Sequence, residues 1–262
     1  MVGFPSRSPI PTQRQVTAES TKAAAGVTAV TVPLTGLQFM KLDPQLGRPN
    51  VFNLFKITAK AAAPQTAGKA VQLFLFVNSR NKLCLWSPHT APLNTALAYT
   101  IFGVPFQAAL YSHIAKQTYT HFGRANPTRI SMMRAVLNSI RVGFKPTFLR
   151  EFGGVGLGLG LKPKVAQAMD RNLPDDYKWL TKFSGLISGL ICGAGTQGFH
   201  NIALRETALH AQTGTSSTSQ AAVSLYKELG CRLAIKNLGP RAAVIGGVTW
   251  IGSETYGRLF IK

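Results

Sequence analysis

The sequence predicts an all-α membrane protein with six transmembrane helices in three pseudo-symmetric helix pairs, joined by short amphipathic helices. Three observations lead to this fold class. A unit of hydrophobic helix, polar segment and second hydrophobic helix occurs three times along the chain. The runs 23–40, 83–115 and 183–204 contain no charged residue, and each is long enough to cross a bilayer at ~1.5 Å per residue. Most Lys and Arg residues lie between the hydrophobic runs.

The charge distribution favours a membrane protein over a nucleic-acid-binding one. The chain has 262 residues, a net charge of +20 and 45% hydrophobic residues. A nucleic-acid partner is not expected, because such binding needs a basic face on a soluble domain. The long segments 41–69, 116–150 and 205–241 together contain 17 Lys and Arg residues, and the short links 80–91 and 162–182 contain seven. The positive-inside bias therefore places the long segments on one side of the membrane and both termini on the other.

The repeats set the domain boundaries. The first twenty residues weakly resemble a mitochondrial presequence, since they carry Arg7 and Arg14 and no acid before Glu19, but their prolines favour a short polar tail. We expect a polar N-terminal tail over 1–21 and three repeats over 22–86, 87–180 and 181–262.

In the first repeat, a helix is predicted over 23–40 and a second over 65–82. Pro33 lies two-thirds along the first helix and predicts a kink there, because proline removes a backbone hydrogen bond. In the second repeat, a helix over 93–116 carries Pro105 in the same way.

The rest of the second repeat has an amphipathic segment and a glycine-rich helix. Apolar residues recur at helical spacing over 129–144, which predicts a helix lying on the membrane surface. Glycines are dense over 152–161. In the third repeat, Gly185, Gly189 and Gly193 recur every four residues, a spacing that lets helices pack closely in lipid. The last helix is predicted over 242–253.

No residue pattern indicates an enzyme, and neither a metal nor a cofactor is expected. The adjacent Asp175 and Asp176 are interpreted as solvated charges rather than a metal site. The glycines of 152–161 follow no strand and lack the lysine of a phosphate loop. The cysteines and histidines have no metal-ligand spacing and are interpreted as packing residues: Cys84, Cys192, Cys231, His89, His113, His200 and His210.

The third repeat resembles the mitochondrial carrier family. The resemblance rests on NIALRETALHAQ, followed by YKELG and KNLGPR, and the repeat architecture extends it to residues 22–262. It implies the six-helix carrier fold with short amphipathic helices on the matrix side, in the mitochondrial inner membrane. In that family each odd-numbered helix ends in Pro-x-Asp/Glu-x-x-Lys/Arg, and the acid of one helix pairs with the base of the next to close a central cavity.

This chain departs from that signature at every repeat. The matching positions contain no acid followed by a base, and Glu206 has the sign reversed, so no matrix ion pair is expected. The nine positions are Pro33, Thr35, Gln38, Pro105, Gln107, Leu110, Asn201, Ala203 and Glu206. The second gate of the family is also missing at its approximate positions, Asn81, Cys84, Pro163, Ala166, Gly257 and Phe260.

The substrate positions of the family fall near Gly68, Arg150 and Val244. Arg150 is the one candidate substrate contact, because an intramembrane charge is costly to bury. The alternative, which we favour, is a local ion pair with Glu151. The resemblance also places cardiolipin, the lipid partner expected, near Phe144, Lys145 and Lys236.

Two functions remain open. The favoured hypothesis is a carrier-like protein that has lost transport and serves as a structural subunit of a respiratory-chain or ATP synthase complex, whose other subunits are its partners. Its basis is the loss of both gates, since alternating access needs two states that are each held closed. The alternative is a divergent carrier of a small anionic metabolite.

Overall fold

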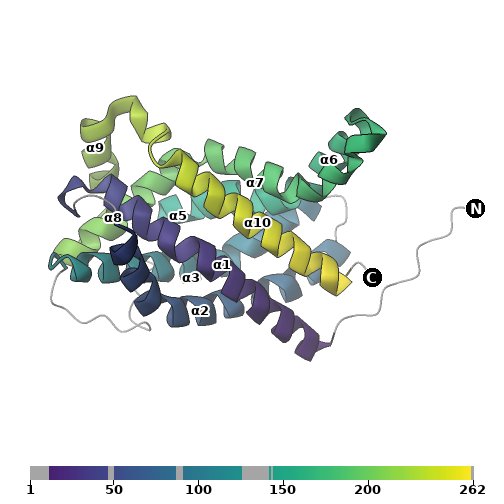
Figure 1. Cartoon of the computed structure of the whole chain (residues 1–262), viewed down its shortest axis with the longest axis horizontal. Helices are drawn as coiled ribbons and strands as arrows, with labels where there is room; N and C mark the ends of the chain where they lie inside the picture. The colour runs from purple at the N-terminus through teal and green to yellow at the C-terminus, as the bar shows by residue number, and fades with distance from the viewer. Residues whose placement is uncertain (1–11, 47–49, 87–90, 126–141, 143, 261–262) are drawn as a thin grey trace, which may run out of the picture.

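The chain folds entirely into helices in the part that the structure describes. This structure is a computed structural model, and it describes residues 12–46, 50–86, 91–125, 142 and 144–260. These residues contain no strand, so the predicted all-α class is confirmed (Figure 1). The helical elements, in order, are α1 (Gln13–Leu42), η1 (Pro44–Leu46), α2 (Val51–Trp86), α3 (Ala91–His121), α5 (Phe144–Glu151), η3 (Phe152–Gly156), α6 (Leu157–Asn172), η4 (Asp175–Phe183), α7 (Ser184–Gly195), α8 (Gln197–Thr213), α9 (Thr218–Leu229), η5 (Gly230–Ala234) and α10 (Leu238–Phe260).

Local side-chain and backbone chemistry fixes several helix ends. Thr12 and Gln15 form a capping box, in which each side chain bonds the other's backbone N–H and so satisfies the first turn of α1. Helix α8 ends at Gly214, whose φ of 81° lies in the left-handed region that glycine adopts without strain. Ser217 accepts a hydrogen bond from the backbone of Gln220 and starts α9.

The long helices form a closed ring. Helix α1 packs on α2, α2 on α3, and α3 on the continuous segment α5–η3–α6. That segment packs on α7 and α8, α7 packs on α10, and α10 returns to α1. The helices α1, α3 and α8 also contact one another across the ring, so their carboxyl-terminal halves converge at one end (Figure 1). We call this end the convergent end.

Several predicted helix boundaries are wrong. Helix α2 begins at Val51, so much of the predicted polar segment 41–69 belongs to the same helix as the hydrophobic run after it. The glycine-rich helix extends over 144–172, with π-helical geometry at Phe152–Gly156. The third long segment is interrupted at Thr196. Physically, lysines with long aliphatic stems continue a helix well, whereas consecutive glycines loosen its hydrogen-bond pattern.

The predicted surface helices have different outcomes. In the third repeat the amphipathic helix is present as α9, which buries Ala221 and Leu225. In the first repeat, the described residues between α1 and α2 include only the short η1. The segment 129–144 lies outside the described residues except for residues 142 and 144.

Two apolar clusters flank a polar middle. One lies at the convergent end and includes Phe39, Met40, Tyr119, Leu204 and Leu225. The other includes Val27, Phe76, Tyr99, Val244 and Ile245. On α1 the buried Thr28 and Thr31, and on α3 the buried Thr100 and Gln107, lie between residues of these two clusters, so the ring has a polar interior at mid-length.

The predicted close glycine packing is confirmed between α6, α7 and α10. A Cβ atom at Gly189 would lie 2.2 Å from Oγ1 of Thr249, and one at Gly158 would lie 3.2 Å from Cα of Gly189. A Cβ at Gly193 would lie 2.9 Å from Ile245. The helices therefore lie so close together that a residue larger than glycine at Gly189 or Gly193 would require them to shift.

Of the described helices, α1 alone combines the length and apolar composition expected of a membrane span. Its most apolar 18-residue stretch has a mean hydropathy of 1.3, and 61% of that stretch is buried inside the ring. A buried core helix of a soluble protein has the same properties. One candidate span is therefore established, and the six-span arrangement is taken up below as a proposal.

Candidate functional site

A small polar cavity occupies the middle of the ring. All six long helical segments contribute polar side chains to its lining, α1 through Thr31, and the free space between them is water-sized. The polar lining includes Lys69, Gln107, Tyr111, Arg150, Glu151, His200 and Arg241. Apart from His200, three of these residues are basic and one is acidic, so the cavity has an excess of positive charge.

Arg150 forms the local ion pair that we favoured from sequence. Its Nη2 lies 2.8 Å from Oε1 of Glu151, and both side chains are at most 5% exposed. The guanidinium also stacks over Tyr111, 4.3 Å from the ring centroid. Arg150 Nη1 is buried and has no hydrogen-bond partner among the described residues. Arg150 is therefore paired and also keeps one donor for another acceptor.

Lys69 joins α2 to α3 across the cavity. Its Nζ donates to Oε1 of Gln107 and, at 2.9 Å, to Oε1 of Gln72. Four residues before Lys69, Gln65 donates to the backbone oxygen of Leu110 at 2.8 Å. The predicted gate positions of the second repeat, Gln107 and Leu110, are thus both bonded to α2, the next helix of the ring.

Gln38, a gate position of the first repeat, joins three helices. Nε2 of His200 on α8 lies 3.0 Å from Oε1 of Gln38. Asn237, at the start of α10, donates to the backbone oxygen of Gln38 at 3.3 Å. The ring of His200 in turn packs edge-on against Tyr111. His200 therefore has the polar packing role predicted for it. Thr35 is also buried, and Pro33 is half-buried.

The gate positions of the third repeat bond mainly within that repeat. Asn201 donates to the backbone oxygens of Leu233 and Lys236, both at 2.8 Å, and so holds the turn before α10. Glu206 accepts a hydrogen bond from Thr218 at 2.9 Å. Ala203 is buried against apolar neighbours. Pro105 in the second repeat is half-buried. Eight of the nine positions carry no charged side chain and therefore cannot form the ion pairs of the family, and Glu206 is the one charged residue among them.

Arg241 stabilises the interruption between α7 and α8. Its Nη2 donates to Thr196 Oγ1 at 2.6 Å, and its Nε donates to the backbone oxygen of Gly193 at 3.3 Å. A backbone oxygen at a helix break needs a partner when it is buried. The π-helical Gly153 and Gly154 pack directly on Thr196, where a Cβ at Gly153 would lie 2.7 Å from the threonine methyl group.

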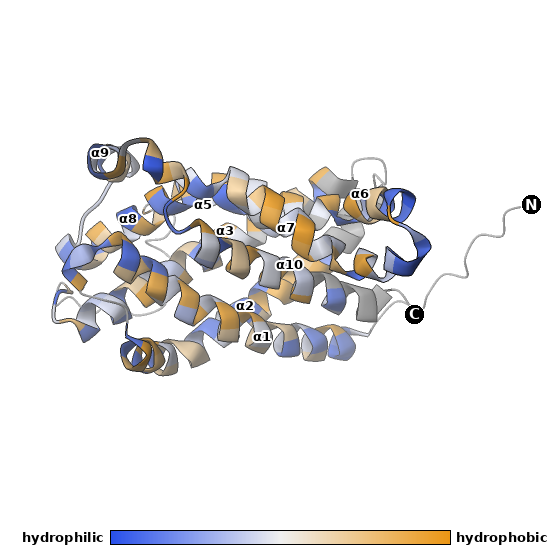
Figure 2. Ribbon diagram, turned by 45° about the horizontal axis from the view of Figure 1, so that its top comes forward, coloured by the Kyte–Doolittle hydropathy of each residue, from blue (hydrophilic) through white to orange (hydrophobic). Residues whose placement is uncertain are grey.

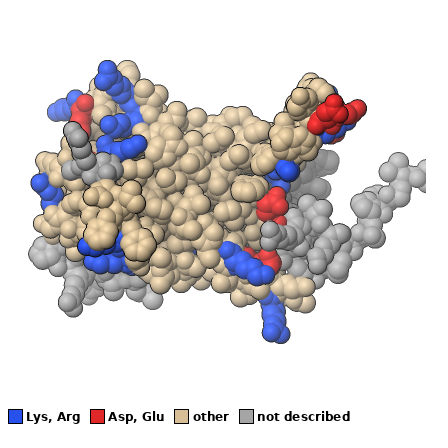
Figure 3. All heavy atoms as spheres, viewed as in Figure 1, with Lys and Arg blue, Asp and Glu red and all other residues tan. Residues whose placement is uncertain are grey.

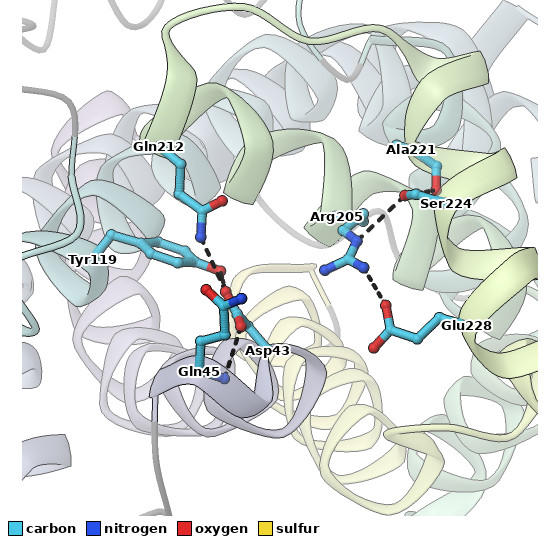
Figure 4. Close-up of polar contacts among 8 residues, drawn as sticks. All are labelled: Asp43, Gln45, Tyr119, Arg205, Gln212, Ala221, Ser224 and Glu228. Atoms are coloured by element: carbon cyan, nitrogen blue, oxygen red, sulfur yellow. Dashed lines mark hydrogen bonds and ion pairs between the residues drawn. The ribbon is translucent and has the colours of Figure 1, made fainter.

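A hydrogen-bonded junction joins α1, α3 and α8 at the convergent end. Asp43 Oδ2 accepts hydrogen bonds from Tyr119 at 2.9 Å and from Gln212 at 3.0 Å, and its Oδ1 accepts from the backbone of Gln45 (Figure 4). Figure 4 also shows Arg205 of α8 bonded to Glu228 of α9. Asp43 was not among the predicted site residues. Its burial shows in the structure, and the available signal in the sequence was that the chain has only nine acidic residues.

The remaining predicted positions are dispersed. Val244 lines the cavity beside Arg150, whereas Gly68 faces Leu110. The lipid-binding candidates Phe144, Lys145 and Lys236 are exposed at the starts of α5 and α10. Of the second-gate positions, Pro163 is exposed and Ala166 half-buried on α6, and the side chains of the other four, Asn81, Cys84, Gly257 and Phe260, lie outside the description.

No metal centre is present in the described part of the chain, because it contains no cluster of three or more His, Cys, Asp or Glu side chains. Comparison with known proteins gives no further constraint on the site. No protein-family model matches the chain, and no curated protein matches it either.

Proposed function

We propose that this chain is a carrier-like inner-membrane protein of mitochondria that has lost transport and acts as a structural subunit of a respiratory-chain or ATP synthase assembly. In this proposal the six long helical segments of the ring cross the membrane. The single observation that carries it is the bonding of the ring interior: fixed hydrogen bonds between helices occupy the positions where a transporter needs contacts that open and close.

The interior bonds favour one state. Transport by alternating access requires two conformations of similar free energy. Here Lys69 joins α2 to α3, Gln38 joins α1 to α8 and α10, and Asp43 joins α1, α3 and α8. Opening either the middle or the convergent end breaks several buried bonds at once. Each such bond contributes ~0.5–1.5 kcal/mol, and a buried group left without a partner costs ~1–3 kcal/mol.

The cavity itself supports a structural role. Its free space is water-sized, and the charge of Arg150 is already matched by Glu151 at 2.8 Å. A metabolite of several carbon atoms does not fit without a large rearrangement of the ring.

The outer surface of the ring supports membrane embedding. Large apolar side chains are exposed on several helices, and Figure 2 shows hydrophobic residues, in orange, along most of the helices of the ring. They include Val71, Leu97, Ile101, Ile191 and Trp250, which are 38–65% exposed. Exposed apolar residues on this many helices are typical of a surface that faces lipid or another membrane subunit.

The test is native gel migration after mild solubilisation of the source membrane, with mass spectrometry of the band. We expect the chain in a large complex, at fixed stoichiometry and resistant to salt. A chain that migrates as a free 28.2 kDa monomer contradicts the proposal.

A second candidate function, the exchange of a small anion, is favoured by one observation. Arg150 Nη1 is a buried donor without a hydrogen-bond partner, and it lies in a cavity that Lys69 and Arg241 also line. A buried donor calls for an acceptor, either water or an anion. Purified protein in liposomes tests it: saturable uptake of a small carboxylate or phosphate that Arg150→Ala abolishes supports transport, and uptake no greater than in protein-free liposomes excludes it.

A further inference from the structure

The segment 162–183, which we call the arm, projects from the end of the ring opposite the convergent end. It comprises most of α6 and all of η4. Figure 1 shows the end of α6 standing clear of the other helices. Element η4 packs mainly on α6 and α7, and none of its residues is buried. The arm therefore contributes little to the core of its own chain.

The tip of the arm presents two ordered aromatic side chains. Tyr177 and Trp179 are 53% and 55% exposed. Trp179 contacts Phe183 edge-to-face, and Nζ of Lys182 lies 5.0 Å from the ring centroid of Trp179 and 5.3 Å from that of Phe183. Phe183 packs in turn against Trp250 of α10, which fixes the base of η4 to the ring. Exposed Tyr and Trp side chains that are ordered in advance are typical anchors of protein interfaces.

The tip of the arm is acidic, although the arm as a whole, residues 162–183, carries five Lys or Arg and three Asp and therefore a net charge of +2. Three of the nine acidic residues, Asp170, Asp175 and Asp176, lie in the stretch 170–179, which carries a net charge of −1 in a chain of +20. Figure 3 shows acidic side chains gathered at the end of this projection. Asp175 pairs with Lys178 at 2.7 Å, and Asp176 has no ion pair among the described residues. An acidic surface repels anionic lipid headgroups and attracts a basic protein surface.

We propose that the arm is a docking element for a partner protein, and that the partner presents a Lys/Arg-rich face to Tyr177, Trp179 and the adjacent aspartates. This inference rests on the proposed structural function and specifies where the chain contacts its assembly. The partner face lies on the side of the membrane that holds the arm, away from the convergent end.

A photo-crosslinking experiment in the native membrane tests the arm. The full-length chain carries Tyr177→p-benzoylphenylalanine, and a control chain carries the same replacement at Tyr226, which is 64% exposed on α9. We expect position 177 to form an adduct with one polypeptide, through a peptide with clustered Lys or Arg. In the variant Asp175→Asn/Asp176→Asn we expect the yield to fall about tenfold, which corresponds to ~1.4 kcal/mol of binding. Position 226 should not form this adduct.

The same samples separate the two proposals. Native gels of the wild-type chain report whether it belongs to a large complex at all, so a free monomer overturns the proposed function. If the wild type migrates in a complex, the arm proposal fails when position 177 labels only lipid, labels a second copy of the chain, or gives a yield that the two Asp→Asn changes leave unaltered. The variant Val223→Ala/Tyr226→Ala serves as a matched control, because it removes exposed side chains outside the arm. It should leave the yield of the adduct at position 177 unchanged.

Discussion

Tyr119 Oη donates a hydrogen bond of 2.9 Å to Asp43, although the two residues lie 76 positions apart in the sequence. Gln212, from a third helix, donates to the same carboxylate oxygen at 3.0 Å. One acidic side chain thereby joins the carboxyl-terminal ends of α1, α3 and α8 (Figure 4). Eight of the nine predicted gate positions are uncharged, and this junction provides a polar connection between three helices at the convergent end.

Replacement of Asp43 by Ala is expected to destabilise the folded chain by ~1–3 kcal/mol, because it leaves the buried hydroxyl of Tyr119 and the half-buried amide of Gln212 without their acceptor. The measurement is a thermal unfolding curve of the purified protein in detergent. Asp175→Ala, which removes a carboxylate that is 91% exposed and paired only at the surface, is the control and should change stability little. Equal shifts for the two variants would show that Asp43 is not a junction.

The buried pair Arg150–Glu151 predicts strong coupling between these two positions. Arg150→Gln or Glu151→Gln alone should lower stability by ~3–5 kcal/mol, because each leaves an unpaired charge in the ring interior. The double variant should recover most of that loss. A double-mutant cycle on unfolding curves measures the coupling. Additive single effects would mean that Arg150 is held by Tyr111 or another group rather than by Glu151.

Gly189→Ala should destabilise the packing of α7 on α10. The new Cβ would lie 2.2 Å from Oγ1 of Thr249 and 3.1 Å from its Cβ, so the helices must separate. The cost of such overpacking is ~1–3 kcal/mol. Thr249→Ala in the same chain should restore part of the stability.

Gly198→Ala is the matched control for that variant, since a Cβ there has no neighbour within 4 Å. It should be neutral or slightly stabilising, as alanine favours a helix over glycine by ~1 kcal/mol. A Gly189→Ala chain as stable as this control would argue against close packing at this interface.

Arg241→Met is expected to loosen the helix break at Thr196. The substitution removes both donors that bond Thr196 Oγ1 and the Gly193 backbone oxygen. Hydrogen exchange should then accelerate about tenfold or more at the amides around residues 193–200, for ~1.4 kcal/mol of lost local protection. Arg124→Met, at an exposed position bonded to Gln45, is the control and should leave this region unchanged. If hydrogen-exchange rates around residues 193–200 were unchanged in Arg241→Met, the contacts of Gly153 and Gly154 with Thr196 would be sufficient to stabilise the break.

Helix positions were largely predictable from sequence, because apolar runs and prolines are local signals. The predicted helices 23–40 and 93–116, which contain Pro33 and Pro105, fall inside α1 and α3, and nearly all of the run 183–204 falls in α7 and the first half of α8. The start of α2 was missed because Lys56 and Lys60 resemble a polar loop in a hydropathy reading, although lysine is a good helix former.

The site was less predictable, because its contacts join residues far apart in the chain. The sequence alone showed that Gln38, Gln107 and Asn201 occupy positions where charged pairs were expected from the family resemblance. Their partners could not: the bond between Gln38 and His200 spans 162 positions, and Lys69 was passed over in favour of its neighbour Gly68. Arg150 and Glu151 were found because they are adjacent, so their pairing is a local property.

For the proposed six-span topology, the interruption at Thr196 has a consequence for how the chain would enter a bilayer. The piece before it, α7, has 12 residues and a length of ~18 Å, which is shorter than the ~30 Å hydrocarbon layer. During biogenesis neither it nor the polar α8 is a complete insertion signal, so an insertion machinery must accept 184–213 as one unit. Arg241, which bonds the break, belongs to α10 and is synthesised later. In the proposed membrane topology, the third helix pair therefore reaches its final form only after the last helix of the chain has entered beside it.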